Sequence, residues 1–293
     1  MELRVLQYFL AVTREQSISG AAESLHLSQP TLSRQLKDME EELGKQLFLR
    51  SNRKITLTEE GMILRKRAEE ILSLVKKTQD EITSLDETIA GDIYIGSGET
   101  DAVRFLAKAA KALQTEHPAV HFHIISGDKA AIIEALDRGL IDFGVLFDEV
   151  DMSKYEYLNI PSAERFGVLM RRTDPLAQKT SIAMEDLWDK PLIISRQMLQ
   201  DETVSRLLQR DLDKLNIAAT YSLLYNGSLM VEEGIGYAIC LDKIINTSGS
   251  SSLCFRPLTR QIETNLYILW KKYPVFTKAV EHFLLKMQEL IQT

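Results

Sequence analysis

The feature that most restricts the fold of this 293-residue chain is a long stretch without helix breakers. From residue 59 to residue 89 there is no proline, and the one glycine, Gly61, lies in the first turn of the expected helix. Through this stretch a seam of residues, apolar at all but one position, recurs at spacings of 4, 3, 4, 3, 4, 3 and 4. That is a heptad pattern, typical of helices that pair. At ~1.5 Å per residue the helix reaches about 45 Å, so the sequence predicts a long linker helix between two domains.

The heptad seam predicts that two copies of the chain pair through this helix. The alternative is that the stripe packs on the chain's own globular domain, which is commoner for short amphipathic helices. Four heptads between two domains favour a partner helix, with Thr78 as the one polar position. The predicted dimerisation residues are Leu64, Ala68, Ile71, Val75, Thr78, Ile82 and Leu85, and Ile89 continues the seam. Ala90-Gly91-Asp92 is expected to end the helix.

Shorter helices are expected before the long one. The first spans roughly residues 3–13, where apolar residues return to one face. Ser17 or Ser19 is expected to cap the second, whose apolar residues also recur at helical spacing. His26 then occupies the turn, a place that favours a residue tolerant of left-handed backbone.

The third helix has the pattern of a DNA-recognition helix. Ser28 is a good N-cap, and Pro30 suits the first turn, where a missing N–H costs nothing. Apolar residues recur at i, i+4 and i+7 and are expected to face inward; they are Leu32, Leu36 and Met39. The opposite face is polar and basic and carries Gln29, Thr31, Ser33, Arg34 and Lys37. Two helices joined by a short turn, the second with such a face, form a helix-turn-helix unit.

A basic segment without a single acid follows, from residue 43 to residue 58. Its basic residues are Lys45, Arg50, Arg53 and Lys54. Ser51-Asn52 supplies a turn between two apolar runs, so a β-hairpin wing is expected, and a basic wing can clamp phosphates. The alternative is a helical lid with a solvated charged face. Caps, inward periodicity and the acid-free strip coincide, and together they favour DNA binding.

Several runs in the first 61 residues match a known pattern. They are LQYF at 6–9, AAESLHLSQPTLSRQL at 21–36, EELG at 41–44, LF at 47–48 and TLTEEG at 56–61. Together they resemble the N-terminal signature of LysR-type transcriptional regulators, and the match is far more specific than a generic helix-turn-helix. The resemblance implies an α+β multidomain protein: a winged helix-turn-helix, a long linker helix and a bilobal α/β effector domain of the periplasmic-binding-protein type (type 2). It also implies antiparallel linker pairing and often tetramers, neither of which the heptads show.

These features and the resemblance set the expected domains and DNA contacts. The winged helix-turn-helix spans 1–58, the linker helix 59–90, the first effector lobe 91–161 with 268–293, and the second lobe 162–267. The predicted DNA-contacting residues are Gln29, Pro30, Thr31, Ser33, Arg34, Lys37, Arg50, Arg53 and Lys54. Arg34 and Gln29 are predicted to read base edges and the others to position the protein, mostly on phosphates. A dimer is expected to read two half-sites related by a two-fold axis.

After Gly91 the pattern changes to alternating strands and helices. Strands are expected at 92–96, 120–126, 143–147, 166–170 and 192–194, and helices at 105–117, 130–140 and 202–215. Such alternation predicts a parallel sheet flanked by helices, here in two lobes with a cleft between them. Ligands in such folds lie outside the carboxyl ends of the strands, near helix N-termini.

The family pattern implies an effector pocket at these strand ends. Its predicted residues are Ser97, Glu99, Thr100, Asp128, Ser195, Arg196, Tyr225 and Asn226. For Thr100, Asp128 and Asn226, capping a helix is as strongly expected as contacting the effector, and one side chain can do both. Glu99 and Asp128 stand where many members of the family have neutral hydroxyls, and two carboxylates would repel an anionic effector unless Arg196 compensates. The hypothesis is therefore a polar or amine-bearing effector.

Other classes of protein fit the sequence less well. An enzyme would need a Ser–His–acid set, a nucleophile elbow, a phosphate-binding glycine loop or a metal cluster, and none is evident. Gly234-Ile235-Gly236 lacks the third glycine of a dinucleotide fingerprint and is expected to be a helix-to-strand turn. His121 and His123 share a strand face without an evident third ligand, so no metal or other cofactor is predicted. A solute-binding transport component conflicts with the missing export signal and the basic N-terminal region.

Composition agrees with a soluble cytoplasmic protein. No apolar run approaches the ~18 residues that a membrane span needs, so no membrane partner is expected. Cys240 and Cys254 lack C-x-x-C spacing and are expected to be buried, inert thiols. The net charge of −7 argues against a uniformly basic DNA coat protein, but local charge decides DNA binding. The expected partners are double-stranded promoter DNA, a small-molecule effector and a second copy of the chain as a homodimer, with a homotetramer and RNA polymerase as further candidates.

Overall fold

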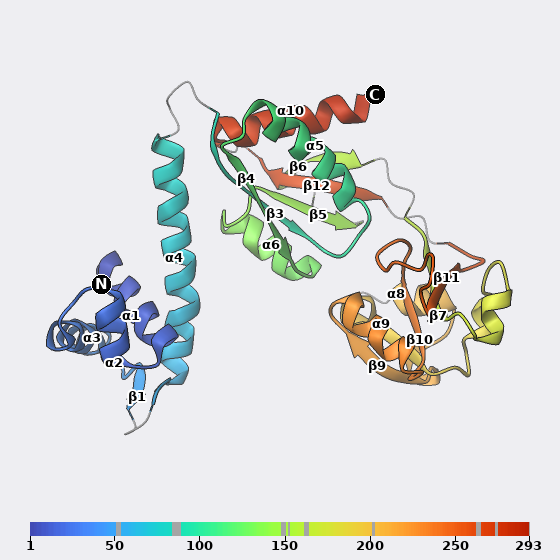
Figure 1. The fold of residues 1–293 in the computed structure, drawn as a ribbon, viewed down its shortest axis with the longest axis horizontal. Helices are drawn as coiled ribbons and strands as arrows, with labels where there is room; N and C mark the ends of the chain where they lie inside the picture. The colour runs from blue at the N-terminus through green and yellow to red at the C-terminus, as the bar shows by residue number, and fades with distance from the viewer. Residues whose placement is uncertain are drawn as a thin grey trace. The chain divides into compact units, whose positions relative to one another are not determined.

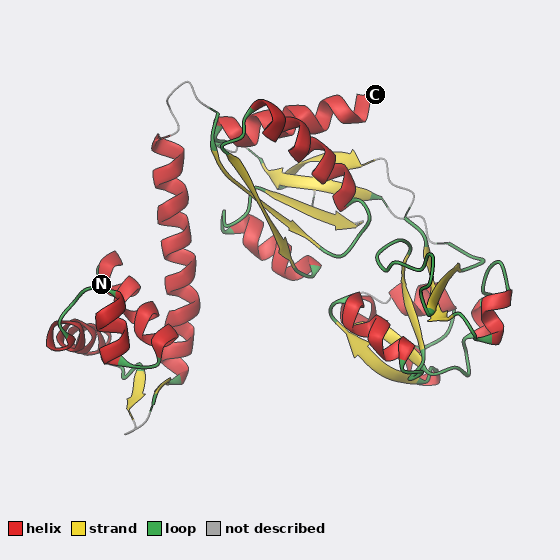
Figure 2. Ribbon diagram, viewed as in Figure 1, coloured by secondary structure: helices red, strands yellow, loops and turns green. Residues whose placement is uncertain are grey.

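The computed structural model describes residues 1–50, 54–83, 89–147, 151, 153–160, 164–200, 203–261, 265–272 and 275–292, with the backbone alone at Arg50, Asp80, Glu81 and Thr83. The chain divides into two units, Met1–Glu87 and Thr88–Thr293 (Figures 1 and 2). Every helix among the described residues is too short or too polar to span a bilayer.

The N-terminal unit is a small helical domain with a hairpin and one long helix. Its elements are α1 (Leu3–Glu15), α2 (Ile18–Ser24), α3 (Gln29–Leu43), β1 (Phe48–Arg50), β2 (Ile55–Leu57) and α4 (Glu59–Thr83). Ser17 is the N-cap of α2, because its hydroxyl accepts a hydrogen bond from the Gly20 N–H at 3.2 Å. His26 has φ +55° in the turn between α2 and α3, as predicted. The local signals in the sequence therefore placed both helices of the helix-turn-helix.

The core of this unit explains how α3 is held. The Leu32 and Leu36 side chains are fully buried, and they pack with residues of α1, α2 and the hairpin. The rings of Phe9 in α1 and Phe48 in β1 lie 5.1 Å apart. Because one face of α3 is buried against three neighbouring elements, its opposite face is presented to solvent.

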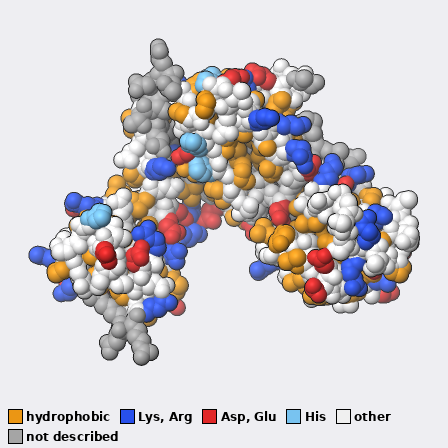
Figure 3. All heavy atoms as spheres, in the orientation of Figure 1, with side chains coloured by type: hydrophobic (Ala, Val, Ile, Leu, Met, Phe, Trp, Pro, Cys, Tyr) orange, Lys and Arg blue, Asp and Glu red, His pale blue; other side chains and the backbone are white. Residues whose placement is uncertain are grey.

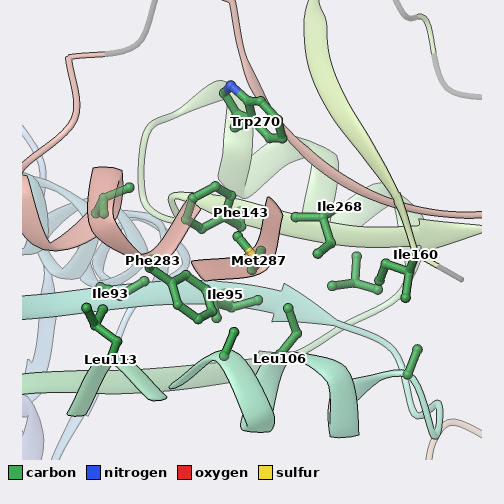
Figure 4. Packing of buried hydrophobic residues seen from close by; sticks show 14 of the residues in the cluster. Ile93, Ile95, Leu106, Leu113, Phe143, Ile160, Ile268, Trp270, Phe283 and Met287 are labelled. Carbon is green, nitrogen blue, oxygen red and sulfur yellow. The ribbon is translucent and has the colours of Figure 1, made fainter. Parts of the chain in front are cut away.

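The first sheet of the C-terminal unit has the strand order β4-β3-β5-β12-β6. Its elements are β3 (Gly91–Ser97), α5 (Val103–Glu116), β4 (Val120–Ser126), α6 (Lys129–Asp137), β5 (Phe143–Phe147), β6 (Tyr155–Ile160), β12 (Leu266–Lys271) and α10 (Lys278–Gln292). Helices α5 and α10 cover one face and α6 the other (Figure 1). Between the sheet and these two helices, Phe143 and Ile95 of the sheet pack with Leu106 of α5 and Phe283 of α10 (Figure 4).

The second sheet has the strand order β11-β7-β10-β8-β9. Its elements are β7 (Phe166–Arg171), β8 (Leu192–Ser195), α7 (Arg196–Gln200), α8 (Thr203–Leu208), β9 (Ile217–Tyr221), α9 (Leu224–Glu232), β10 (Tyr237–Leu241) and β11 (Leu253–Pro257), with 3-10 turns at Pro175–Gln178, Met184–Asp186 and Leu212–Lys214. Residues of α7 and α8 pack on one face, and residues of α9 on the other. The turn at Gly234, where φ is +83°, joins α9 to β10 as expected.

Three details differ from the sequence-based expectations. Both sheets are mixed rather than parallel, because β12 runs antiparallel to β5 and β6, and β7 antiparallel to β10 and β11. The helix expected at 202–215 is wrong in length: α8 ends at Leu208, and Gln209 with φ +52° breaks it before a 3-10 turn. The strands β6, β9, β11 and β12 and the helices α7 and α10 were not among the elements expected from the sequence. In β6 the apolar residues alternate too weakly to stand out from a loop.

Candidate nucleic-acid interface and effector site

The exposed face of α3 carries most of the residues predicted to contact DNA. Ser33 is half-buried, and the others are exposed; these are Gln29, Pro30, Thr31, Arg34 and Lys37. The helix begins at Ser28, whose hydroxyl accepts a hydrogen bond from the Thr31 N–H at 3.3 Å and lies 2.7 Å from the Thr31 hydroxyl. The cap thus fixes the first turn of α3 and orients Thr31 within it.

The two basic side chains on this face have acidic neighbours on the same helix. Arg34 lies 4.0 Å from Asp38, and Lys37 lies 3.3 Å from Glu41. All four side chains are more than half exposed, and such pairs contribute little because water screens them. Acidic side chains lie among the basic ones on the visible face of this unit (Figure 3). A phosphate or a base edge can therefore replace Asp38 and Glu41 as the partners of Arg34 and Lys37 at a small cost in free energy.

The hairpin forms the expected wing. β1 and β2 pair antiparallel, with Phe48 opposite Leu57 and Arg50 opposite Ile55. Lys54 is exposed and lies directly before β2. Arg53 and the Ser51-Asn52 turn lie outside the described residues, and so does the side chain of Arg50.

Glu40 holds the wing against α3, a role that the sequence did not reveal. Its Oε1 accepts hydrogen bonds from the backbone N–H groups of Leu47 at 2.7 Å and Phe48 at 3.2 Å. A negative charge near a helix C-terminus is unfavourable for the helix dipole. An acid there beside an apolar run is a signal that the carboxylate has a partner outside the helix, and this signal could have identified Glu40.

The start of α4 is fixed to the same hairpin. The Thr58 hydroxyl donates to the carbonyl of Gln46 at 2.8 Å and accepts from the N–H of Gly61 at 3.0 Å. A Cβ on Gly61 would lie 2.2 Å from the Leu47 carbonyl oxygen, so only glycine fits. The pKa of Glu60 lies below its ordinary value. The main cause is a hydrogen bond between its carboxylate and its own backbone, and the second is the hydrogen bond that Lys45 donates to it at 3.2 Å. Wing and linker helix therefore meet in a defined geometry.

The first half of the heptad seam packs inside its own unit. Ala68 is fully buried in the N-terminal core, and Leu64 and Ile71 pack partly buried against it. The prediction that Ala68 contacts a partner helix is therefore wrong, because this chain alone covers it. Here the alternative interpretation of the stripe is correct. Ile89 does not continue the seam either, because it packs against the core of the first sheet.

The second half of the seam lies open along α4. A shallow groove of about 320 Å³ is lined by Ile71, Leu74, Val75, Thr78 and Gln79. The Thr78 hydroxyl donates to the Leu74 carbonyl at 2.9 Å, which satisfies it within the helix. Ile82 is 63% exposed, and Leu85 lies outside the described residues. An apolar stripe this open is suited to a partner surface.

The predicted effector residues lie at the carboxyl ends of parallel strands, and three of them have local roles. Ser97, at the end of β3, is buried and donates to the Gly98 carbonyl at 2.8 Å. Asp128 caps α6, because its Oδ1 accepts from the Ala131 N–H at 2.9 Å. The Ser195 hydroxyl, at the end of β8, accepts from the Met198 N–H at 3.4 Å.

Three further predicted effector residues point into solvent. Arg196, Tyr225 and Asn226 are exposed, and Arg196 has no ion-pair partner within the described ranges. Tyr225 and Asn226 both lie in the first turn of α9, which begins at Leu224. Asn226 therefore does not cap that helix. Its N-cap residue is Leu223, which has no side-chain acceptor.

The remaining two predicted residues, Glu99 and Thr100, connect the two sheets. The Thr100 hydroxyl donates to Glu164 at 2.6 Å and accepts from the Ala102 N–H at 3.1 Å. Glu99 accepts a hydrogen bond from the backbone N–H of Leu224, at the start of α9. The sequence did not identify Glu164, because its partner is 64 residues away.

Two other features of the first sheet bear on ligand binding. His123 lies 3.0 Å from the Asp92 carboxylate and stacks on Tyr94 at 4.6 Å, so a carboxylate and a ring already engage this histidine. A groove of about 610 Å³ lies between α5 and β4, with Leu106, Phe122 and Ile124 among its lining residues. None of the predicted effector residues lines this groove.

The chain combines a winged helix-turn-helix unit with two helix-covered sheets, an architecture suited to a ligand-responsive DNA-binding regulator. The family profile described as "Bacterial regulatory helix-turn-helix protein, lysR family" matches residues 3–62, and the one described as "LysR substrate binding domain" matches residues 86–291. The chain therefore belongs to the LysR family. It is a DNA-binding transcriptional regulator with an effector-binding domain, in a family of regulators rather than enzymes.

Individual relatives agree with this assignment. The HTH-type transcriptional regulator BsdA of Bacillus subtilis (strain 168) is 33% identical over 218 residues, 74% of each chain. A hydrogen peroxide-inducible genes activator of Pectobacterium carotovorum subsp. carotovorum is 27% identical over 217 residues, 73% of this chain and 71% of that protein. The structure of full-length CbnR complexed with its target DNA superposes with a TM-score of 0.77 over 99% of both chains at 20% identity, which supports the fold.

Proposed function

We propose that this regulator binds double-stranded promoter DNA as a homodimer, with α3 in the major groove and the wing on the phosphate backbone. The observation that carries the proposal is the two-sided character of α3. Leu32 and Leu36 are fully buried on one side, while Arg34 and Lys37 are exposed on the other. A helix held in this way can enter the groove with its polar face first. Arg34 and Gln29 are assigned to base edges, and Arg50, Arg53 and Lys54 to phosphates.

The dimer contact is assigned to the second half of α4. The open residues of the seam there are Val75, Thr78 and Ile82, and Leu85 is the next position by spacing. Two chains paired in this way carry two recognition helices, so the operator is expected to contain two half-sites related by a two-fold axis.

The domain limits at 58/59, 90/91, 161/162 and 267/268 belong to the same proposal. So do the cytoplasmic location, a homotetramer as the higher assembly and RNA polymerase as a further partner.

The effector is assigned to the carboxyl ends of the parallel strands, between the two sheets. Support comes from the topology, because β3 and β4 in one sheet and β8 and β9 in the other end beside helix N-termini. Arg196, Tyr225 and Asn226 are exposed there. Asp128 and Glu99 add carboxylates, which favours a polar or amine-bearing effector over a simple anion.

A peroxide response like that named for one relative is not supported for this chain. Cys240 is buried, and burial, followed by the negative charge of Asp242, raises the pKa of its thiol far above the ordinary value. Cys254 is also buried, and the two cysteines lie on strands separated by β7, with their side chains in cores on opposite faces of the sheet. A thiol needs access and thiolate character to react, and a disulfide needs Cα atoms within about 7 Å.

The DNA-binding proposal is tested with Arg34→Ala in the full-length protein. Fluorescence anisotropy compares DNA from upstream of the protein's own gene with a scrambled duplex of equal length. A base-reading arginine contributes about 1–3 kcal/mol of discrimination, so the ratio of specific to non-specific affinity should fall by about 5- to 150-fold. Arg65→Ala is the matched control, because Arg65 is also exposed but lies on α4, where it pairs with Glu69 at 3.1 Å. Equal ratios for the two variants would refute the assignment of α3.

A further inference from the structure

The loop between β3 and α5 touches the second-sheet half of the C-terminal unit through three consecutive residues. Glu99 accepts a hydrogen bond from the Leu224 N–H, and Thr100 donates to Glu164 at 2.6 Å. Asp101 lies 3.8 Å from Lys243, which follows β10. Glu99 and Asp101 are half-buried and Thr100 is buried, but Lys243, the partner of Asp101, is exposed. Glu99 and Thr100 therefore carry most of the contact, because exposed ion pairs contribute little.

Helix α9 depends on this loop for its cap. The first N–H groups of any helix lack acceptors within the helix. The N-cap residue of α9 is Leu223, which supplies no side-chain oxygen, and the first turn contains no acidic residue. The acceptor comes instead from Glu99, which is 125 residues away in sequence. A carboxylate at this position is favoured both by the N–H group and by the positive end of the helix dipole.

The charge of Glu99 reaches the core around α9. Burial is the main cause that raises the pKa of Tyr221, and its electrostatic interactions with Cys240 and then Glu99 raise it further. Tyr221 ends β9, two residues before the N-cap of α9. The hydrogen bond with Leu224 therefore brings the Glu99 carboxylate close to the end of β9 as well as to the start of α9.

We propose that Glu99 is an internal anion that joins the two sheets at α9 and selects against anionic effectors there. This rests on the proposed function, which places the effector at the carboxyl ends of the strands. A free carboxylate or phosphate that approaches the Leu224 N–H must displace a carboxylate that the chain tethers at high effective concentration. It must then lie beside the displaced charge, which repels it. An uncharged or cationic effector faces neither obstacle and can pair with the second oxygen of Glu99.

The test is hydrogen exchange, followed by mass spectrometry, of the full-length protein and its Glu99→Ala variant. The peptide that covers the start of α9 should exchange on the order of tenfold faster in Glu99→Ala, because a helix loses its cap. Glu99→Gln keeps an acceptor oxygen without the charge, and its peptide should exchange at an intermediate rate. Glu116→Gln is the matched control: its carboxylate pairs with Lys286 at 2.8 Å within the first-sheet half, so α9 should be unchanged.

Acetate, against chloride at equal ionic strength, is the anionic probe. It should slow exchange at the start of α9 in Glu99→Ala, because it fills the vacated position, and leave the wild-type peptide unchanged. Unchanged exchange in Glu99→Ala, no protection of that variant by acetate, or equal protection of the wild type would each overturn the proposal. Specific DNA binding of the wild type is measured in parallel, so that the two proposals can fail separately. Absence of specific DNA binding counts against the proposed DNA interface of α3 and the wing. The exchange rate at the start of α9 decides only the role of Glu99.

Discussion

Replacing Glu40 with alanine should loosen the wing and weaken DNA binding. The carboxylate accepts two backbone hydrogen bonds, at 2.7 Å and 3.2 Å, from the chain that enters β1. A hydrogen bond to a charged group contributes about 1.5–3 kcal/mol when buried. The two bonds share one oxygen, and Glu40 is half-buried, so we expect a loss of about 2 kcal/mol from the free energy of unfolding of the N-terminal unit. In a unit of this size that corresponds to about 8–16 °C in Tm.

Urea denaturation and anisotropy with operator DNA measure the two effects of Glu40→Ala. Glu42→Ala is the matched control, because Glu42 is exposed and its partner at 2.6 Å is the N-terminal amine, so its loss should cost under about 0.5 kcal/mol. Glu40→Gln keeps the accepting oxygen and should fall between the two. The reasoning fails if Glu40→Ala and Glu42→Ala unfold at the same urea concentration, or if Glu40→Ala binds DNA as the wild type does.

Three more outcomes are expected. Gly61→Ala should destabilise the N-terminal unit by about 2–3 kcal/mol in urea denaturation, because its Cβ would lie 2.2 Å from a backbone oxygen; a neutral effect would contradict the close approach of α4 to the wing. Neutralising Arg53 and Lys54 together should weaken binding to all DNA sequences alike and reduce the salt slope of log K by about 0.9 for each phosphate that the wing no longer neutralises; an unchanged slope would refute the wing assignment. The pKa of Glu116 lies below its ordinary 4.5 because Lys286 donates to it, so this pair stabilises above pH 4.5 and its stabilising effect disappears as the pH falls through the lowered pKa. Lys286→Ala should therefore make unfolding less steeply dependent on pH below 4.5 in acid titrations, and an unchanged dependence would exclude the pair as its source.

The helix-turn-helix could be predicted from the sequence because its signals are local. The Ser17 and Ser28 caps, the left-handed His26 and the inward spacing of α3 each involve residues within about two turns of one another. The role of Glu40 is different. Its partners are only seven and eight residues away, but they lie in another element, and no spacing rule relates a helix end to a strand start.

The contacts of the effector domain could be predicted only in part. Strand ends indicated where Ser97, Glu99 and Asp128 lie, because topology fixes the side of a sheet on which parallel strands end. What these side chains touch depends on how the two halves pack, and periodicity contains no such information. The partner of Glu99 is a backbone N–H, which every residue but proline has, so no sequence pattern could have identified it.

The heptad seam shows what periodicity can and cannot determine, and it leads to a final prediction. Spacing defines a face of α4 but not what covers that face, and the structure divides it: Ala68 is buried in its own core, while Ile82 is exposed. One continuous helix therefore joins the DNA-binding core to the proposed dimer contact, so its phase and length set the distance between the two recognition helices.

Inserting one residue after Leu74 would rotate Val75 and the residues after it by about 100° and should abolish dimerisation. Inserting seven residues restores the face and adds about 10 Å of helix. In sedimentation and operator-spacing assays, the seven-residue variant should dimerise but prefer a changed half-site spacing. Normal dimers from the one-residue variant would place the dimer contact elsewhere in the chain.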